Sequence, residues 1–165
     1  MAGHSLAIVT FDQSEAEIQA HIDGPVQAAW EWLLAVVDNQ DFEAAWDLTA
    51  PELRRTRAHA WLSANPAEEQ NVEQLVQGIA PEPLRSRFAA AELSAYAESF
   101  GHLDTSQMGS ASRPRVVGPD AELVVLAQLG QEPKVFTEPT LVHGLTFLMH
   151  LVRGRWMVAD PDYRD

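Results

Sequence analysis

The residues best suited to acid–base chemistry lie near the end of the chain. His143 and Asp160 belong to two runs of alternating apolar residues, which Arg153-Gly154 separates. A two-residue hairpin loop there would place Phe147 opposite Asp160 and put His143 on the same apolar face, near the open end of the hairpin. Burial raises the pKa of a carboxyl group, and a neighbouring histidine can exchange a proton with it. The pair therefore predicts an acid–base site; the alternative is two hydrated residues at strand ends.

Tyr96 is the third candidate for catalysis. It lies on a predicted helix just before the sheet and could project its hydroxyl into a cavity, or it could be a core tyrosine whose hydroxyl is satisfied. The apolar residues that we expect to border a ligand are Trp30, Phe147, Met149 and Trp156. Core packing explains the same residues, because helical spacing and strand alternation already predict their burial. Trp32 is expected on another side of its helix from Trp30, at the pocket mouth or on a partner surface.

Metal and cofactor chemistry have little support in the sequence. The six histidines include no pair at i, i+4, there is no His-Glu-x-x-His run, and the chain has no cysteine. Nucleophile-elbow, phosphate-loop and dinucleotide-binding patterns are also missing. We therefore predict no metal site and no cofactor.

Charge excludes further classes of partner. The 165 residues carry 24 acidic and 11 basic side chains, a net charge of −13, and the first 53 residues hold ten acids with no Lys or Arg. Phosphate backbones and anionic membranes would repel such a chain, so nucleic acid and membranes are poor partners. Without a basic, apolar leader we expect a cytoplasmic protein. The acidic third is either solvated surface or a docking patch for a basic partner, and Arg54, Arg55 and Arg57 are expected to balance nearby acids.

Apolar periodicity changes from helical to strand-like near Gly101, which predicts an α+β protein. We expect a loose lead-in over residues 1–24, with a short helix over 14–22 that Ser14 caps, and one domain over 25–165. Its predicted helices cover 25–38, 42–48, 51–61, 68–78 and 84–100. Asp41 should cap the second helix, Thr49 and Glu52 should form a capping box for the third, and Gly78 should end the fourth. Strands are predicted over 115–117, 121–129, 134–138, 141–152 and 155–160.

The predicted hairpin separates two sheet faces. The more apolar face, which we expect against the helices, carries His143, Leu145, Phe147, Met149, Leu151, Trp156, Val158 and Asp160. The mixed face carries Thr146, Leu148, His150, Val152, Arg155, Met157 and Ala159. A sheet face this apolar usually has a partner, so the mixed face predicts a homodimer.

This order of elements resembles the nuclear-transport-factor-2-like superfamily, with its polyketide-cyclase-like (SnoaL-like) and ketosteroid-isomerase-like families. The resemblance covers about residues 25–160 and rests on the helix Val26–Val37, the run Asp41-Phe42-Glu43-Ala44-Ala45-Trp46-Asp47-Leu48 and the closing hairpin over 145–160. Local similarity to an actinobacterial group rests on Trp46-Asp47-Leu48-Thr49, Ala60-Trp61-Leu62-Ser63-Ala64-Asn65, Ser112-Arg113-Pro114-Arg115-Val116-Val117 and Phe147-Leu148-Met149, and implies no particular activity.

The resemblance implies helices packed on a strongly curved antiparallel sheet, a cone-shaped α+β barrel that encloses an apolar pocket. Related enzymes place Asp, His or Tyr in that pocket. The isomerase pattern of an aspartate base with a tyrosine and a neutral carboxylic acid has no residue-by-residue match, because Tyr96 and Tyr163 lie in the wrong half of the chain. We expect a protein that binds a small apolar metabolite. An acid–base isomerase, cyclase or hydrolase and an acidic interaction module are the alternatives.

Overall fold

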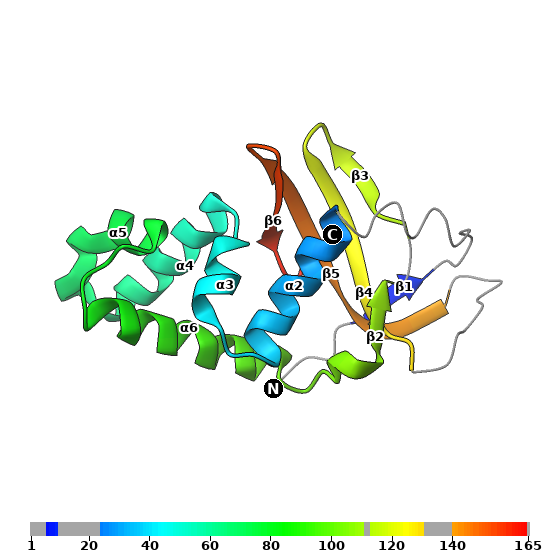
Figure 1. Cartoon of the computed structure of the whole chain (residues 1–165), viewed down its shortest axis with the longest axis horizontal. Coiled ribbons are helices and arrows are strands. Elements are labelled where there is room, and N and C mark those ends of the chain that lie inside the picture. Colours follow the sequence, from blue (N-terminus) through cyan, green and yellow to red (C-terminus); the bar gives the residue numbers. More distant parts are fainter. Residues whose placement is uncertain (1–5, 10–23, 111–112, 131–139, 165) are drawn as a thin grey trace.

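The computed structural model describes residues 6–9, 24–110, 113–130 and 140–164. It has an α+β architecture in which a first short strand and then the α-helices precede the other strands of an open antiparallel sheet (Figure 1). The α-helices are α2 (Pro25–Val37), α3 (Phe42–Asp47), α4 (Pro51–Ala64), α5 (Val72–Gln77) and α6 (Leu84–Phe100), with 3-10 turns η1 (Pro66–Asn71) and η2 (Thr105–Gln107). The strands are β1 (Leu6–Val9), β2 (Met108–Ser110), β3 (Arg115–Gly118), β4 (Ala121–Gln128), β5 (Thr140–Val152) and β6 (Arg155–Asp160). The α+β prediction is confirmed; the closed cone is not observed.

Short local sequence features fix most helix ends. Pro25 occupies the first turn of α2, where its missing N–H costs nothing, and the Asp41 carboxylate accepts a hydrogen bond from the N–H of Ala44 at the start of α3. Gly78 ends α5 at φ 73°, a left-handed conformation that favours glycine. One predicted helix differs, because the segment 68–78 divides into η1 and α5.

Long strands β4 and β5 form the centre of the sheet. β4 pairs with β5 along its length, while β3 and β2 pair with successive parts of the other edge of β4. β5 pairs with β1 near its start and with β6 near its end. Two short strands, β1 and β2, fall where the sequence predicted a lead-in and a loop. The predicted helix 14–22 and strand 134–138 lie outside the described residues.

The hairpin between β5 and β6 has the predicted turn but not the predicted register throughout. Arg153 and Gly154 both have positive φ, at 52° and 80°, as a tight hairpin turn requires. Pairing follows the prediction from the turn to Met149 opposite Val158. A register shift then places Asp160 opposite Leu148 instead of Phe147, so the predicted pairing of Phe147 with Asp160 is wrong. One extra residue in β6 causes the difference, because it moves every later side chain to the other face.

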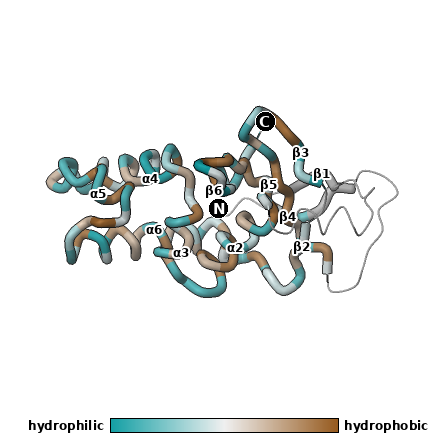
Figure 2. Tube along the Cα trace, turned by 45° about the horizontal axis from the view of Figure 1, so that its top comes forward, coloured by the Kyte–Doolittle hydropathy of each residue, from teal (hydrophilic) through white to brown (hydrophobic). Residues whose placement is uncertain are grey.

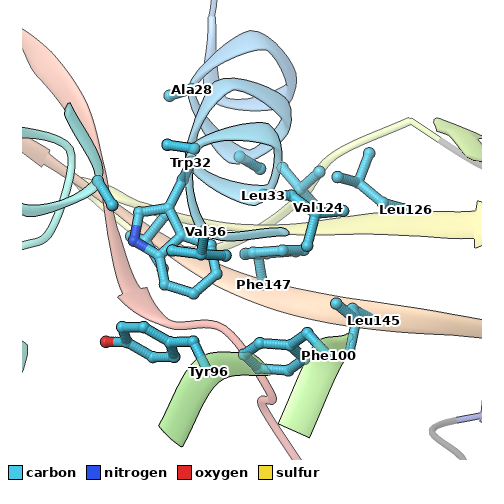
Figure 3. Packing of buried hydrophobic residues seen from close by; sticks show 14 of the residues in the cluster. Ala28, Trp32, Leu33, Val36, Tyr96, Phe100, Val124, Leu126, Leu145 and Phe147 are labelled. Atoms are coloured by element: carbon cyan, nitrogen blue, oxygen red, sulfur yellow. The ribbon is translucent and has the colours of Figure 1, made fainter. Parts of the chain in front are cut away.

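A first apolar cluster, which we call the sheet core, joins α2, the end of α6 and one face of the sheet. Its fully buried members include Trp32, Leu33, Val36, Phe147 and Met149. The other buried members of the sheet core are Ala28, Ala29, Ala35, Ala45, Tyr96, Phe100, Leu103, Val124, Leu126, Leu145 and Val158. Figure 3 shows Trp32 projecting from α2 toward Tyr96 and Phe100, with Phe147 beside it.

Trp32 is the central side chain of the sheet core, so its predicted place at a pocket mouth is wrong. Its indole is 0% exposed, and its ring meets that of Tyr96 edge-on at 5.0 Å. α2 is apolar on most sides, and small Ala28 and Ala29 let the face centred on Trp32 approach the sheet. The Trp32 indole N–H donates to Thr49 Oγ1 at 3.1 Å, and that hydroxyl donates to the Ala45 carbonyl. Thr49 therefore does not form the predicted capping box, and α4 begins without a side-chain cap.

A second cluster, which we call the helical core, lies beyond the edge of the sheet on the side of β6 (Figure 1). It consists of Trp46, Ala58, Leu62, Leu75, Val76, Ala80, Leu84 and Phe88, with Phe42, Trp61 and Val72 at its edge. Hydrophilic residues predominate on the outer parts of α4 and α5 (Figure 2). The segment that connects α3 to α4 runs along β6 between the two cores. The N–H of Val158 donates to the Leu48 carbonyl, and the N–H of Ala50 donates to the Val158 carbonyl.

Candidate functional site

One row of side chains along α6 links both cores. Leu84 and Phe88 belong to the helical core, and Tyr96 and Phe100 belong to the sheet core. Between them, at the same four-residue spacing, stands Glu92, which is only 3% exposed. Burying a carboxylate in the middle of an apolar helix face costs free energy unless the charge is paired. Glu92 lies where the two cores meet, so we expect its partner and a site there.

Arg57 of α4 provides the partner for Glu92. Its Nε donates to Glu92 Oε2 at 2.8 Å and its Nη2 to Oε1 at 3.2 Å, a two-point contact between a half-buried guanidinium and a buried carboxylate. Burial raises the pKa of Glu92, and the hydrogen bonds and charge of Arg57 offset this only in part. Burial acts to lower the pKa of Arg57, but the hydrogen bonds and charge of Glu92 outweigh it and the pKa is raised. Arg57 therefore stays charged, while Glu92 binds a proton more readily than a hydrated glutamate.

Tyr96 lies beside this ion pair. The Arg57 guanidinium sits 5.3 Å from the centre of the Tyr96 ring, within the range of a cation–π interaction. The Tyr96 hydroxyl is buried and has no hydrogen-bond partner. It points away from the other labelled side chains of the sheet core (Figure 3). Burial raises the pKa of this hydroxyl and the nearby Glu92 charge raises it further, although Arg57 acts in the opposite sense. At neutral pH the group is thus a protonated donor, not a base.

A pocket of about 450 Å³ opens next to Arg57 and Tyr96. It lies between the first turns of α4, the last turns of α6 and the end of β6, so it is built where the two cores meet. Its walls are formed by Glu52, Leu53, Thr56, Arg57, Ala95, Tyr96, Ser99, Phe100, Ala159, Asp160 and Pro161. The volume falls within the range of small-molecule sites, and the lining combines apolar surface with a few polar groups, as such sites do.

Asp160 reaches this pocket because of the register shift in β6. Its Oδ1 accepts a hydrogen bond from the backbone N–H of Asp162 at 2.9 Å, which holds the carboxylate at the end of the strand. No basic side chain of the described segments lies within ion-pair distance of Asp160. The pocket is thus bordered by a carboxylate that has no cationic partner among the described residues and by a buried hydroxyl without a hydrogen-bond partner, from two distant parts of the sequence.

The other predicted site residues lie elsewhere. His143 is exposed on β5, opposite Leu6 of β1, and is separated from Leu148, the partner of Asp160, by five residues or about 17 Å along the strand. Phe147 and Met149 are fully buried in the sheet core, and Trp30 and Trp156 pack at its edge. None of these five side chains lines the pocket, whereas the predicted Tyr96 and Asp160 both do.

Sequence reasoning missed Arg57 and Glu92. The row Leu84, Phe88, Glu92, Tyr96 and Phe100 contained the clue, since a single acid interrupts an otherwise apolar stripe. No comparable feature of the sequence singles out Arg57 as the partner of Glu92. The three neighbouring arginines of α4, expected to form one surface cluster, in fact take separate roles: Arg54 donates to backbone carbonyls, Arg55 pairs with Glu73, and Arg57 pairs with Glu92.

A larger groove of about 700 Å³ lies between α3, the turn after α5 and the start of α6. Most of its charged groups already have partners: Arg54 donates to carbonyls, Arg85 pairs with Glu82, and Asp41 caps α3. Because no buried polar group without a partner faces it, we regard the smaller pocket as the better candidate.

Searches of the described segments found no group of three or more His, Cys, Asp or Glu placed to hold a metal ion, and no helix long and apolar enough to cross a membrane. Comparison with known proteins added no relative. The chain matches no protein-family model, no curated protein and no solved structure.

Proposed function

We propose that this protein binds a small molecule in the pocket between α4, α6 and the end of β6. The observation that carries the proposal is the Tyr96 hydroxyl, which is buried beside the pocket without a hydrogen-bond partner. Folded proteins pair nearly all of their buried polar groups, so an exception needs a reason. A bound molecule that offers an acceptor would supply the missing partner.

The ion pair of Arg57 and Glu92 supports the same proposal. Replacing a buried ion pair by apolar residues of similar size is often neutral or stabilising, so such a pair is weak evidence for stability alone. Groups with shifted pKa values beside a cavity are frequent at binding and catalytic sites. Here the pair borders the pocket and fixes Arg57 over the Tyr96 ring.

Filling the pocket tests the proposal. Ala95 lines it from α6, whereas Ala97 lies two residues further on and is exposed outside it. We expect 3-phenylpropan-1-ol to bind the natural chain in a ligand-observed NMR titration, Ala95→Phe to abolish binding, and Ala97→Phe to leave it unchanged. No binding to the natural chain, or equal binding to a folded Ala95→Phe variant, would overturn the proposal.

Tyr96→Phe provides a second test, because a ligand-binding role and a purely structural role of Tyr96 predict different results. Removing a hydroxyl that makes no hydrogen bond should leave the free energy of unfolding unchanged or slightly higher. The affinity for an acceptor-bearing probe should fall. A loss of stability without a loss of affinity would indicate a purely structural tyrosine.

An acid–base enzyme acting in this pocket is a second candidate, favoured because Tyr96 and Asp160, two of three residues predicted for catalysis, both line it. Asp160 would accept a proton from substrate and the Tyr96 hydroxyl would donate to a developing oxyanion. Deuterium exchange at the carbon next to the carbonyl of 4-phenylbutan-2-one, monitored by NMR, tests this role. Asp160→Asn should abolish any exchange that the natural chain catalyses; an unchanged rate would exclude Asp160 as the base.

Membership of the nuclear-transport-factor-2-like superfamily belongs to the same proposal. Helices that precede an antiparallel sheet, with a helix and the sheet bordering a site, support it. A cytoplasmic homodimer through the mixed face of β5 and β6 is part of that expectation. Light scattering on the purified chain tests it, because a monomer would contradict it.

A further inference from the structure

We propose that the pocket selects a positively charged ligand, an amine on an apolar body that also carries a neutral acceptor such as a hydroxyl or ether oxygen for Tyr96, and discriminates against anions. This inference rests on the proposed function, since it assigns a chemical class to the ligand of the same pocket. The charges that line the pocket carry it, taken together with the partners that each of them already has.

Arg57 cannot serve as an anion receptor at little cost. Two of its N–H groups are committed to the Glu92 carboxylate at 2.8 and 3.2 Å. An anionic ligand bound to the remaining N–H groups of Arg57 would share one positive charge with the Glu92 carboxylate, whose side chain is only 3% exposed, and would be repelled by it. An unpaired buried carboxylate is strongly unfavourable, so the positive charge of Arg57 is in effect cancelled within the protein.

Asp160, one of the two acids that line the pocket, has no such internal balance. Glu52 contacts the imidazole of His150 at the rim, but Asp160 has no cationic partner in the described part of the chain. Its single described hydrogen bond comes from a backbone N–H and uses only Oδ1. An ammonium group would give Asp160 the opposite charge that the described residues do not supply.

The remaining surface suits an apolar body. Leu53, Ala95, Phe100, Ala159 and Pro161 contribute apolar lining to the pocket. At about 450 Å³ the pocket accommodates a ligand of roughly a phenylpropyl size. The net charge of −13 on the chain would also favour the approach of cations over anions.

Three probes of the same shape test the charge preference: 3-phenylpropylamine, 3-phenylpropan-1-ol and 3-phenylpropanoate. Dissociation constants would be measured by NMR titration at low salt and neutral pH. We expect the amine to bind about fivefold more tightly than the alcohol, the difference between a charged and a neutral hydrogen bond, and the carboxylate to bind more weakly than both.

Asp160→Asn tests whether Asp160 causes the preference for the amine. The amide keeps the Oδ1 acceptor for the backbone N–H of Asp162 and loses only the charge. We expect amine and alcohol then to bind equally. Asp162→Asn is the matched control: it removes a nearby acid that does not line the pocket and should keep the fivefold preference. Raised salt should weaken the amine alone.

The outcomes separate the two proposals. Equal binding of the three probes, tighter binding of the carboxylate, or a preference that survives Asp160→Asn would overturn the charge assignment and leave small-molecule binding in place. Failure of all three probes to bind the natural chain would overturn both.

Discussion

The sheet core and the helical core bury aromatic rings by different means. The sheet core assembles α2, the end of α6 and three strands around Trp32, so its contacts join residues far apart in the sequence. The helical core is built within residues 42–88, with Phe88 at the centre of the rings of Phe42, Trp46 and Trp61. Its rim is held by cations, with Arg54 over Trp46 and Arg87 over Trp61. One core is closed by a sheet, the other by short helices.

The candidate site lies where these two cores meet. α6 passes through both, and neither core covers Glu92 and Tyr96 completely with apolar side chains. Sites commonly form at such boundaries, because two bodies with separate packing requirements leave a cleft between them. Both cores are almost entirely apolar, whereas the junction between them holds Glu92, the one buried residue of the described segments that carries a charge.

Trp32→Ala should break the sheet core and produce the largest effect. Removing a fully buried indole costs about 3–5 kcal/mol, because apolar contacts are lost and a cavity remains. Urea denaturation followed by circular dichroism measures the free energy of unfolding. Trp32→Phe should cost much less, since the ring remains and Thr49 keeps its bond to Ala45. Equal losses for both substitutions would contradict the central place of the indole.

Phe88→Ala should cost about 3 kcal/mol and act mainly on the helical core. The six-residue helices α3 and α5 cannot be stable alone, so their amide protection depends on the ring contacts of Phe88. We expect hydrogen exchange to accelerate in α3 and α5 and to stay slow in β4 and β5. Uniform acceleration would show that the two cores unfold as one unit.

Arg57→Met tests the junction and should destabilise by about 2 kcal/mol at pH 7. It leaves the Glu92 carboxylate buried without a cation, whereas Glu92→Gln leaves Arg57, which is 31% exposed and can be hydrated. Glu92→Gln should therefore cost less than Arg57→Met. The double variant Arg57→Met, Glu92→Leu should recover most of the loss. Thermal and urea unfolding of the three variants provides the comparison, which the reverse order of costs would refute.

The dependence of stability on pH should show the smallest effect. Because burial raises the folded-state pKa of Glu92 above its ordinary value of 4.5, the folded chain binds more protons than the unfolded chain between the two values. The stabilising contribution is thus fully present below 4.5 and is lost as pH rises through the raised value. The Glu92→Gln variant has no carboxyl group at this position, so its stability lacks this pH-dependent contribution. The stability of the natural chain relative to Glu92→Gln should therefore increase from pH 7 to pH 4, and a constant difference would contradict the raised pKa.

The helices were largely predictable because their signals are local. Pro25, Asp41 and Gly78 each act within one turn of chain, and the predicted ends of α2 and α3 and the C-terminal end of α5 agree with the structure to within a residue or two. The rotation of α2 was not predictable, because that helix is apolar on most of its surface. Only the approach of the sheet to Ala28 and Ala29 selected the face of Trp32.

The site was predictable in part. Tyr96 and Asp160 were chosen from residue type and position, and both line the pocket, but the proposed geometry joined Asp160 to His143. The two residues lie about 17 Å apart along the strand, and a single extra residue in β6 also moves Asp160 to the other face; strand alternation cannot reveal where a bulge will fall. Arg57 and Glu92 are 35 residues apart in the sequence, so their pairing depends on how α4 packs against α6.

The sequence alone determined the order of the α-helices and of the strands β3, β4, β5 and β6, the hairpin turn at Arg153 and Gly154, and the net acidity, because propensity, backbone conformation and charge act over short distances or simply add. The tertiary structure decided the rotation of α2, the division into two cores and the meeting of Arg57, Glu92, Tyr96 and Asp160 around one pocket. These features depend on which side chains exclude water together, and that is fixed only when distant segments pack against each other.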